Sequence, residues 1–325
     1  MRHATILAAL TLAATPALAD DPVLTVYTYD SFATEWGPGP AIQAGFEAEC
    51  DCSLRIVPAG DGAALLSRLM LEGARSEADV VIGLDNFLME RARETGLFAP
   101  HGVEAQFDLP VEWEDDTFVP YDWGAFAFVA TRDIAAPASL RELADSNIAV
   151  VIQDPRSSTP GLGLALWVKA VYGDGAQALW ADLADNLVTV TPGWSEAYAL
   201  FLSGEADAVL SYTTSPAYHV IAEGDDEKVA WNFAEGNPVQ IEVAAMLAHT
   251  GKPELAQEFL AYLASPEGQA PIPETNWMFP AVLPEGGLHP AFDEGYPAQP
   301  LIITPEEAAG LRDAAVEGWQ AGLAR

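Results

Sequence analysis

Basic residues are scarce in this chain of 325 residues. Its 14 lysines and arginines stand against 48 aspartates and glutamates, which gives a formal net charge of −34 at pH 7. A surface of this kind repels phosphate backbones, so nucleic acid is excluded as a partner. Two explanations of the acidity stay open: a solvated, salt-tolerant surface, or an electric field that draws in a cation.

Cysteine is nearly absent as well, because Cys50 and Cys52 in the sequence CDC are the only two. They supply too few ligands for a structural metal site, and the neighbouring sequence adds none. In an oxidising compartment the two can bridge to each other, although so small a loop adds little entropic stabilisation. We predict a structural disulfide between Cys50 and Cys52.

No apolar run beyond residue 19 is long enough to span a bilayer. Residues 1–19, MRHATILAALTLAATPALA, have a basic residue near the start, an apolar centre and an A-x-A motif at the end. This pattern is typical of a cleaved secretory signal peptide rather than of a membrane anchor. We therefore predict an exported protein whose mature chain begins at about residue 20.

Strand and helix patterns alternate in two blocks along the mature chain. The first block runs LTVYTY, AIQAGFEAEC, SLRIVPA, GAALLSRLMLEG, ADVVIGL and NFLMERARETG, which indicates a βαβαβ unit with parallel strands. The second block runs from residue 147 to the predicted strand ADAVLSY at 206–212. A chain of this length buries more than one core, which favours two lobes.

Two segments, 117–132 and 228–248, are long enough in extended form to pass from one lobe to the other, and we interpret both as hinge crossovers. The predicted fold is therefore α/β, with two α/β lobes joined by two hinge crossovers and a ligand cleft between the lobes. The predicted boundaries are 22–121 and 238–275 for lobe 1, 122–237 for lobe 2, and 276–325 for a C-terminal segment with a terminal helix that is assigned to neither lobe.

Polar side chains follow the predicted strands at their carboxyl ends, where open α/β sheets bind ligands. The first block contributes Asp30, Asp61 and Asp85, and the second contributes the stretches 155–159 and 213–216. Two such edges that face each other would form a cleft between the lobes.

Three tryptophans, Trp36, Trp194 and Trp277, lie in or beside predicted loops. Packing explains any single one of them, since most aromatic side chains are buried for their area alone. Three together favour a planar or cationic ligand, because indole faces stack on rings and attract cations.

The stretch RSSTPGLGLALWVKAVYG at 156–173 predicts a helix with Thr159 as the N-cap and Pro160 as the first helical residue. Free amides at the positive end of this helix suit a hydroxyl or a phosphate group. Ordinary self-capping explains the same residues equally well. Arg156 either adds charge to this site or forms an ion pair at the surface.

The chain contains, in this order, the segments VLTVYTYDSFATEWGPGP, GDG, ADVVIGLDN, QDPRSSTPGLGL, TPGWSEAY, SYTTSPAY and NWMFP. With these segments it resembles the periplasmic thiamine-binding proteins, the substrate-binding subunits of thiamine ABC importers. The resemblance extends from residue 24 to the NWMFP segment and is weaker beyond it. Segments of this length and order are far more specific than a short motif.

The resemblance implies a type II periplasmic binding protein, located in the periplasm, that captures thiamine and also thiamine monophosphate and thiamine diphosphate. It further implies delivery to the membrane permease of an ABC importer with its cytoplasmic ATPase. No enzymatic activity and no cofactor are expected, because the vitamin is the transported ligand. The positions that match ligand contacts of the family are Asp61, Gly62, Ser158, Thr159, Trp194, Tyr212, Thr213, Thr214 and Ser215, and those that match its aromatic pocket are Trp36, Tyr218, Trp277 and Tyr29.

The chemistry of thiamine agrees with these residues. Its thiazolium carries a fixed positive charge, for which aromatic faces and the carboxylate of Asp61 are suitable partners, with about 0.5–2 kcal/mol from each cation–π contact. Its aminopyrimidine needs hydrogen-bond donors and acceptors, which the backbone and hydroxyls of residues 212–215 supply.

Three other classes of protein fit less well. A polyamine receptor of the same fold would combine aromatics with several carboxylates, and Asp30, Asp61 and Asp85 keep this alternative open. A ferric-iron receptor would use adjacent tyrosines, and the sequence has no Tyr-Tyr pair. A secreted hydrolase would need a nucleophile, a base and an acid, but no G-x-S-x-G elbow occurs, and of the histidines only His219 falls close to the predicted site.

Overall fold

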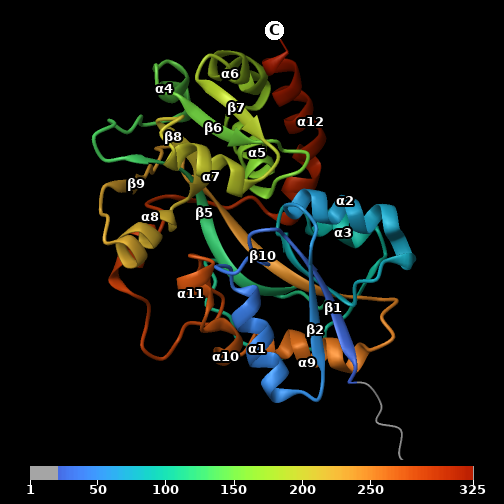
Figure 1. Cartoon of the computed structure of the whole chain (residues 1–325). Helices are drawn as coiled ribbons and strands as arrows, with labels where there is room; N and C mark the ends of the chain where they lie inside the picture. The colour runs from blue at the N-terminus through green and yellow to red at the C-terminus, as the bar shows by residue number, and fades with distance from the viewer. Residues whose placement is uncertain (1–20, 325) are drawn as a thin grey trace, which may run out of the picture.

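The computed structural model of the chain describes residues 21–324, and the predicted signal peptide at 1–19 lies outside the described residues. Figure 1 shows two α/β parts, one above the other, with long strands running between them. We call the part built on strands β1, β2 and β3 lobe 1, and the part built on β6, β7 and β8 lobe 2. Between residues 21 and 324 no helix combines the length and apolar character that a membrane crossing requires.

Lobe 1 begins with the expected βαβαβ unit, whose parallel strands lie in the order β2-β1-β3. Later helices of the chain pack beside it, since α9 and α10 contact α1. Its elements are β1 (Val23–Thr28), α1 (Gly39–Glu49), β2 (Ser53–Pro58), α2 (Gly62–Glu72), η1 (Gly73–Arg75), β3 (Val80–Asp85), α3 (Met89–Glu94), β4 (Phe98–Ala99), α9 (Pro253–Leu263), α10 (Pro266–Gln269) and α11 (Ile272–Thr275).

Lobe 2 repeats the same layering of helices on a sheet, with parallel strands in the order β8-β6-β7. Its elements are α4 (Leu140–Ala144), β6 (Val150–Gln153), α5 (Thr159–Tyr172), η2 (Gly173–Gly175), α6 (Ala176–Leu183), β7 (Leu187–Thr191), α7 (Trp194–Leu202), β8 (Ala208–Tyr212), α8 (Ser215–Tyr218), η3 (His219–Glu223) and β9 (Lys228–Ala230).

Two long strands, β5 (Val119–Thr131) and β10 (Asn237–Leu247), run antiparallel to each other through the middle of the molecule. On one side β10 pairs with β3 of lobe 1, and on the other side β5 pairs with β8 of lobe 2. The segments interpreted as crossovers are thus buried central strands in the sheet order β2-β1-β3-β10-β5-β8-β6-β7. Their sequences are largely apolar because both faces of these strands are covered by other parts of the protein.

The C-terminal segment runs from lobe 1 to lobe 2 and makes a third connection between them (Figure 1). Strand β11 (Phe279–Pro280) pairs with β5 and β12 (Pro300–Leu301) pairs with β10, with η4 (Pro290–Gly295) between them. The terminal helix α12 (Pro305–Leu323) begins with a capping box and packs on α5 and α6. In the structure the terminal helix therefore lies on lobe 2.

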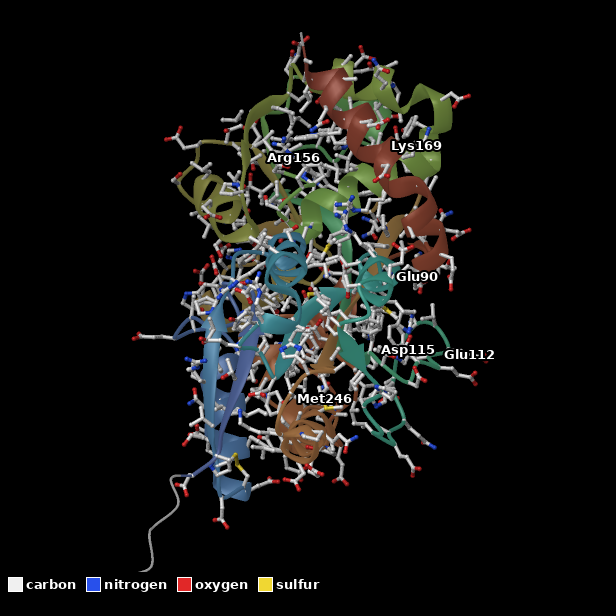
Figure 2. All side chains as sticks on the ribbon, turned by 90° about the vertical axis from the view of Figure 1, so that its right-hand side faces the viewer. Glu90, Glu112, Asp115, Arg156, Lys169 and Met246 are labelled. Carbon is white, nitrogen blue, oxygen red and sulfur yellow. A yellow bond between two sulfur atoms is a disulfide. The ribbon has the colours of Figure 1, made fainter. Side chains whose placement is uncertain are left out.

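The structure resolves two local questions raised by the sequence, and Figure 2 labels one of the residues, Arg156. Cys50 and Cys52 are joined by a disulfide at the end of α1. Arg156 forms an ion pair with the carboxylate of Asp154 and lies over the ring of Trp319 in α12, with 5.4 Å between the guanidinium carbon and the ring centroid. Arg156 therefore belongs to the surface, the second of its two interpretations.

Candidate ligand-binding site

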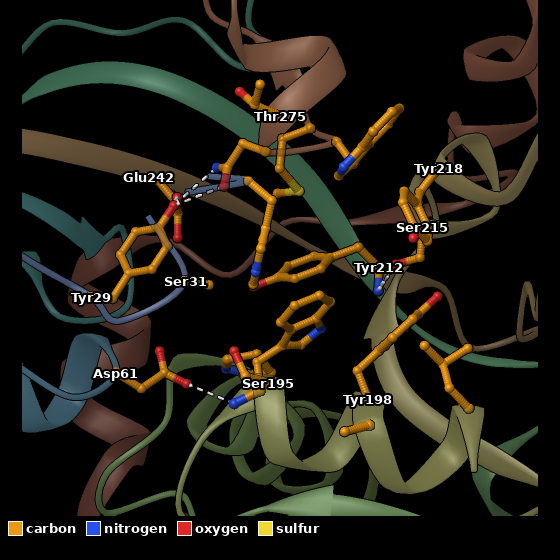
Figure 3. A pocket seen from close by; sticks show the side chains of 18 of the residues that line it. Tyr29, Ser31, Asp61, Ser195, Tyr198, Tyr212, Ser215, Tyr218, Glu242 and Thr275 are labelled. Carbon is orange, nitrogen blue, oxygen red and sulfur yellow. Dashed lines mark hydrogen bonds between the residues drawn. The ribbon is translucent and has the colours of Figure 1, made fainter. Parts of the chain in front are cut away.

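A cavity of about 520 Å³ lies between the lobes (Figure 3). The lobes touch beside it, because the amide of Ala64 in α2 donates a 2.9 Å hydrogen bond to the carbonyl of Ser157 before α5. The residues that line the cavity are Tyr29, Ser31, Trp36, Asp61, Pro160, Trp194, Ser195, Tyr198, Ala199, Leu202, Tyr212, Ser215, Tyr218, Glu242, Glu274, Thr275, Asn276, Trp277 and Met278.

One wall is aromatic and belongs to helix α7. Trp194 is the first residue of this helix, and its indole stacks on Tyr198 one turn later, with ring centroids 4.8 Å apart and planes 27° apart. The indole nitrogen of Trp194 donates to the hydroxyl of Ser211 at 2.8 Å, and this hydroxyl is also 2.8 Å from that of Ser215. The hydrogen bonds fix the plane of the indole before any ligand arrives.

A second aromatic pair faces the cavity, formed by Trp277 from the segment after α11 and Tyr218 from α8. Trp277 has a φ of 57° and is the only non-glycine residue with positive φ among residues 21–324. Its ring meets Tyr218 edge-on, with centroids 5.2 Å apart. A left-handed backbone is costly for a bulky residue and persists where the surroundings enforce it. Trp36, in the loop before α1, is 54% exposed.

The floor of the cavity carries the carboxylate of Glu242, from strand β10. Glu242 accepts hydrogen bonds from the hydroxyls of Tyr29 at 2.9 Å and Tyr121 at 2.5 Å, and from the amide of Gln240 at 3.2 Å. Burial raises the pKa of Glu242 to about 7, although both tyrosine hydrogen bonds act in the opposite direction. None of the described residues that line the cavity is Lys, Arg or His, so this carboxylate has no basic partner there.

The carboxylate of Asp61 accepts hydrogen bonds at the starts of three helices. Its carboxylate accepts from the amide of Gly62 in α2 at 2.7 Å, from the hydroxyl of Ser158 before α5 at 2.7 Å, and from the amide of Trp194 in α7 at 3.3 Å. Burial raises the pKa of Asp61, and these hydrogen bonds partly offset that effect. Because α2 belongs to lobe 1 while α5 and α7 belong to lobe 2, Asp61 links the two lobes.

Helix α5 begins one residue earlier than the sequence analysis expected. Ser158 is its N-cap and Thr159 its first residue, so the assignment of Thr159 as the N-cap was wrong by one position. The side chain of Ser158 makes no cap bond to its own helix and points to Asp61 instead. Self-capping therefore does not account for this serine.

Eight of the thirteen predicted site residues line the cavity, and the other five lie behind its wall. Those that line it are Tyr29, Trp36, Asp61, Trp194, Tyr212, Ser215, Tyr218 and Trp277. Those behind the wall are Gly62, Ser158, Thr159, Thr213 and Thr214, all of them buried.

Gly62 is explained by close packing between the lobes. A Cβ at this position would lie 2.2 Å from the hydroxyl oxygen of Thr159 and 2.7 Å from the carbonyl oxygen of Gly83. Any larger residue would push lobe 2 away from lobe 1 at the point where Asp61 joins them.

Sequence reasoning missed several residues of the cavity, above all Glu242, Asn276 and Tyr198. A signal for Glu242 existed, because it is the single charged residue in the largely apolar run VQIEVAAML. A buried charge in a central strand is costly and is rarely kept without a role. Asn276 had no such signal, since a polar residue beside a loop is ordinary.

His219 braces the aromatic wall from behind. One ring nitrogen lies 2.9 Å from the hydroxyl of Tyr198 and the other 2.7 Å from the carboxylate of Glu223. His219, Glu223 and Asp225 also lie close enough to hold a metal ion, but the ammonium of Lys228 is 3.0 Å from Asp225 and supplies the positive charge. Both nitrogens of His219 are thus engaged away from the cavity.

Comparisons with known proteins agree with this geometry. The family model described as bacterial extracellular solute-binding protein matches residues 24–275. The thiamine-binding periplasmic protein of Escherichia coli strain K12 is 53% identical over 313 residues, which cover 94% of each chain. A solved structure titled periplasmic thiamin binding protein has a TM-score of 0.90 at 52% identity and covers 94% of this chain and 97% of that one.

The ferric binding protein from Campylobacter jejuni, with a TM-score of 0.76 at 19% identity over 92% of this chain and 99% of that one, shares the fold. The solved structures confirm the predicted α/β architecture of two lobes, and the family model and the relatives at about half identity cover most of the chain. The chain is a type II periplasmic binding protein and belongs to the bacterial extracellular solute-binding proteins, in the group of the thiamine-binding periplasmic proteins.

Proposed function

We propose that this protein captures thiamine in the periplasm and delivers it to an ABC-type importer. The observation that carries the proposal is a cavity with aromatic walls and a buried carboxylate floor that has no basic residue among its described lining residues. Such a cavity favours a flat cation, because aromatic faces and carboxylates both attract positive charge. The names of the relatives at about half identity indicate which flat cation it is.

In this proposal each part of thiamine has a partner. The faces of Trp194 and Tyr212 hold its two rings, and Glu242 and Asp61 supply negative charge for the thiazolium. The volume of about 520 Å³ is in the range of small-molecule sites. The hydroxyl of Ser215 and the neighbouring backbone supply hydrogen bonds for the aminopyrimidine.

We extend the proposal to thiamine monophosphate and thiamine diphosphate. The starts of α5 and α7 offer amides and positive helix ends, which suit a phosphate. In the present structure Asp61 accepts hydrogen bonds from the amide of Trp194 in α7 and from the hydroxyl of Ser158 before α5, so a phosphate has to share these helix starts with a carboxylate.

The partners in this proposal are the membrane permease of the importer and its cytoplasmic ATPase. The relatives are named as binding proteins of the periplasm, and the same compartment is proposed here. No catalytic role is proposed for any residue, because His219 is explained as a brace for Tyr198. Thiamine is thus cargo and not a cofactor.

The rival ligands fit the cavity less well. Asp30, which would help to bind a polyamine, lies outside the cavity and accepts a hydrogen bond from the amide of Gly60. A ferric ion would need free phenolate oxygens, but the hydroxyls of Tyr198 and Tyr218 contact His219 and Glu223. Neither ligand explains the stacked indole of Trp194.

Tryptophan fluorescence tests the proposal directly. Addition of submicromolar thiamine should quench or shift the emission, because Trp194 lies in the wall, whereas spermidine and ferric citrate should have no effect. Trp194→Phe keeps a stacking ring and should lose most of the signal, and Trp180→Phe, at a buried site in α6, serves as the matched control. An equal response to thiamine and spermidine would contradict the proposal. Calorimetric titration with the three thiamine forms then ranks them.

A further inference from the structure

Three carboxylates stand side by side beneath the cavity, on three neighbouring strands. Asp85 of β3 lies opposite Glu242 of β10, and Glu242 lies opposite Asp122 of β5. All three residues are buried. Like charges placed opposite each other destabilise a sheet, and burial increases the cost. A proton or a cation must therefore neutralise part of this row in the folded protein.

The hydrogen bonds show where such a proton belongs. One oxygen of Asp85 accepts from the amides of Phe87 and Leu88 at 3.1 and 3.0 Å, and its other oxygen is buried with no hydrogen-bond partner. Burial, and then the charge of Glu242, raise the pKa of Asp85 well above its usual range, whereas its two amide hydrogen bonds favour the charged form. Glu242 accepts from two tyrosine hydroxyls and one amide, as described above. Asp122 accepts from Asn276 through one oxygen, and its other oxygen is buried with no hydrogen-bond partner.

Glu242 and Asp122 form the pair that has to hold the proton. Burial, and then the charge of Glu242, raise the pKa of Asp122 well above its usual range, and burial raises the pKa of Glu242 to about 7. Among the described residues, the titratable groups that face this pair include no basic side chain. They are Tyr29 at the end of β1, Asp61 before α2, Asp85 in β3, Tyr121 in β5 and Tyr212 in β8.

We propose that the Glu242–Asp122 pair holds a proton while the cavity is empty and releases it to solvent when the thiazolium of thiamine enters. One O–H bond breaks, the proton passes to the buffer, and the net charge of the cavity is unchanged. The pair thereby selects a ring with a permanent positive charge over a neutral ring of the same shape. This inference rests on the proposed function, and it adds the charge that the site requires of its ligand.

The direction of the pH effect follows from linkage. In the empty cavity the pKa of the pair is raised, and a bound cation lowers it, so binding removes a proton only where the empty pair still holds one. Above the raised pKa the affinity is highest and constant. As the pH falls through about 7, the affinity for thiamine falls, by up to about tenfold per pH unit for one proton.

Calorimetric titration in two buffers of equal pH and different ionisation enthalpy counts the protons. The wild-type protein should release most of one proton per thiamine at pH 6 and much less at pH 8.5, because the pKa of Glu242 is about 7. Glu242→Gln should release almost none at either pH. Glu235→Gln is the matched control, because Glu235 also accepts a hydrogen bond from a tyrosine, Tyr172, but lies outside the cavity, and it should release as much as the wild type.

A neutral isostere of thiamine, with thiophene in place of the thiazolium, completes the experiment. It should bind without releasing a proton, and the ratio of the two affinities should fall about tenfold between pH 8 and pH 6. If the wild type binds thiamine with no proton release, or if Glu242→Gln releases as much as the wild type, this inference is overturned and the proposed function stands. If thiamine gives neither heat nor a fluorescence change at any pH, the proposed function itself fails.

Asp122→Asn is the second variant, for the case that Glu242→Gln does not fold, which circular dichroism shows. Burial still raises the pKa of Glu242 in this variant, so proton release at pH 6 should remain. A folded Asp122→Asn protein that binds thiamine at pH 6 without releasing a proton would overturn the inference.

Discussion

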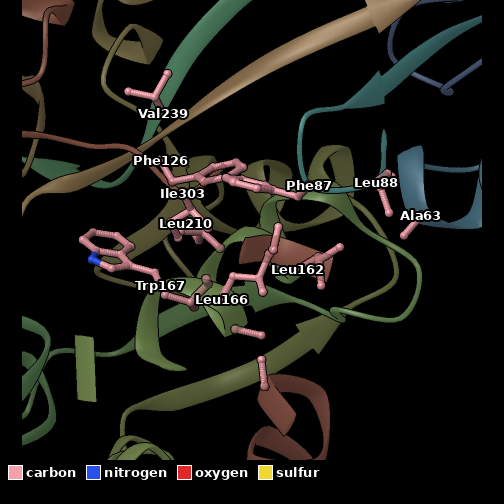
Figure 4. Close-up of a cluster of buried hydrophobic side chains, with 14 of the residues drawn as sticks. Ala63, Phe87, Leu88, Phe126, Leu162, Leu166, Trp167, Leu210, Val239 and Ile303 are labelled. Carbon is pink, nitrogen blue, oxygen red and sulfur yellow. The ribbon is translucent and has the colours of Figure 1, made fainter. Parts of the chain in front are cut away.

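The two central strands β5 and β10 bury two regions of opposite character. In the half nearer lobe 2, Phe126 and Val239 pack into a cluster with Phe87, Trp167 and Leu166 (Figure 4). In the other half, the same strands bury Asp122 and Glu242, two of the three carboxylates of the row beneath the cavity. The first region gains free energy from burial, while the second loses it, because a buried charge without a cation is costly.

The difference separates residues that keep the fold from residues that hold the ligand. A sequence that served stability alone would place apolar side chains in both halves of these strands. The carboxylates break that rule beneath the cavity, where a proton or a bound cation has to offset their cost. Substitutions in the two regions should therefore affect stability and ligand affinity separately.

The largest effect should follow from Leu166→Ala in the apolar cluster. Leu166 is completely buried in α5, so its truncation should lower the free energy of unfolding by about 2–5 kcal/mol. The residue lies outside the cavity, and thiamine affinity of the folded variant should stay within twofold of the wild type. Urea unfolding and fluorescence titration measure the two quantities. A large loss of affinity would show that cluster and cavity are not separable.

Glu242→Gln should raise the free energy of unfolding at pH 8, in contrast to Leu166→Ala, which should lower it. The pKa of Glu242 is about 7 when folded and about 4.3 when unfolded, so its contribution to stability is complete below pH 4 and is lost as the pH rises through 7. Glutamine has no such titration. At pH 8 the empty variant should therefore be more stable than the wild type by about 1–3 kcal/mol, even though it binds thiamine more weakly.

Urea unfolding of wild type and Glu242→Gln from pH 5 to pH 8 tests this sign. The gain in stability should shrink as the pH falls, because protonation relieves the wild type of the same charge. A variant that is less stable than the wild type at pH 8 would mean that the hydrogen bonds from Tyr29 and Tyr121 outweigh the cost of the charge.

Trp194→Ala should act on the ligand and little on the fold. The loss of a stacked indole should weaken thiamine binding by at least about 1 kcal/mol, which calorimetry resolves. Trp194→Phe keeps a ring over Tyr198 and should lose less. If the alanine variant binds thiamine as well as the wild type, the stacking wall assigned to α7 has no part in recognition.

The strand–helix alternation let the sequence predict both lobes and the cavity between them. Parallel strands and their carboxyl ends follow from local pattern, so Asp61, Trp194 and Tyr212 could be expected at one edge. The carboxylate row could not be expected, because it depends on which residues of three strands face each other. Asp85, Glu242 and Asp122 are far apart in the sequence, and only the register of β3, β10 and β5 unites them.

The role of Asp61 also depends on distances between the lobes. The sequence predicted free amides at the start of α5, and its serine, threonine and proline residues do mark the start of this helix. No local rule indicates that a carboxylate from lobe 1 reaches those amides. That contact exists because Gly62 lets Thr159 approach closely.

The smallest effect should come from Asp61→Asn, which sharpens the contrast within the cavity itself. The variant removes the negative charge from the starts of α2, α5 and α7 but keeps a side chain of the same shape. Positive helix ends favour an anion by about 0.3–1 kcal/mol each, so the affinity for thiamine diphosphate relative to thiamine should rise several-fold.

Calorimetric titrations with both ligands give this ratio, and Asp30→Asn, an exposed carboxylate outside the cavity, is the matched control that should leave it unchanged. If Asp61→Asn weakens the binding of both ligands equally, Asp61 contacts a part of the molecule that thiamine and thiamine diphosphate share, and the phosphate does not bind at the helix starts. A rise confined to the diphosphate would instead assign opposite tasks to the two carboxylates, with Glu242 selecting the charge of the ring and Asp61 setting the tolerance for the phosphate at the other end of the ligand.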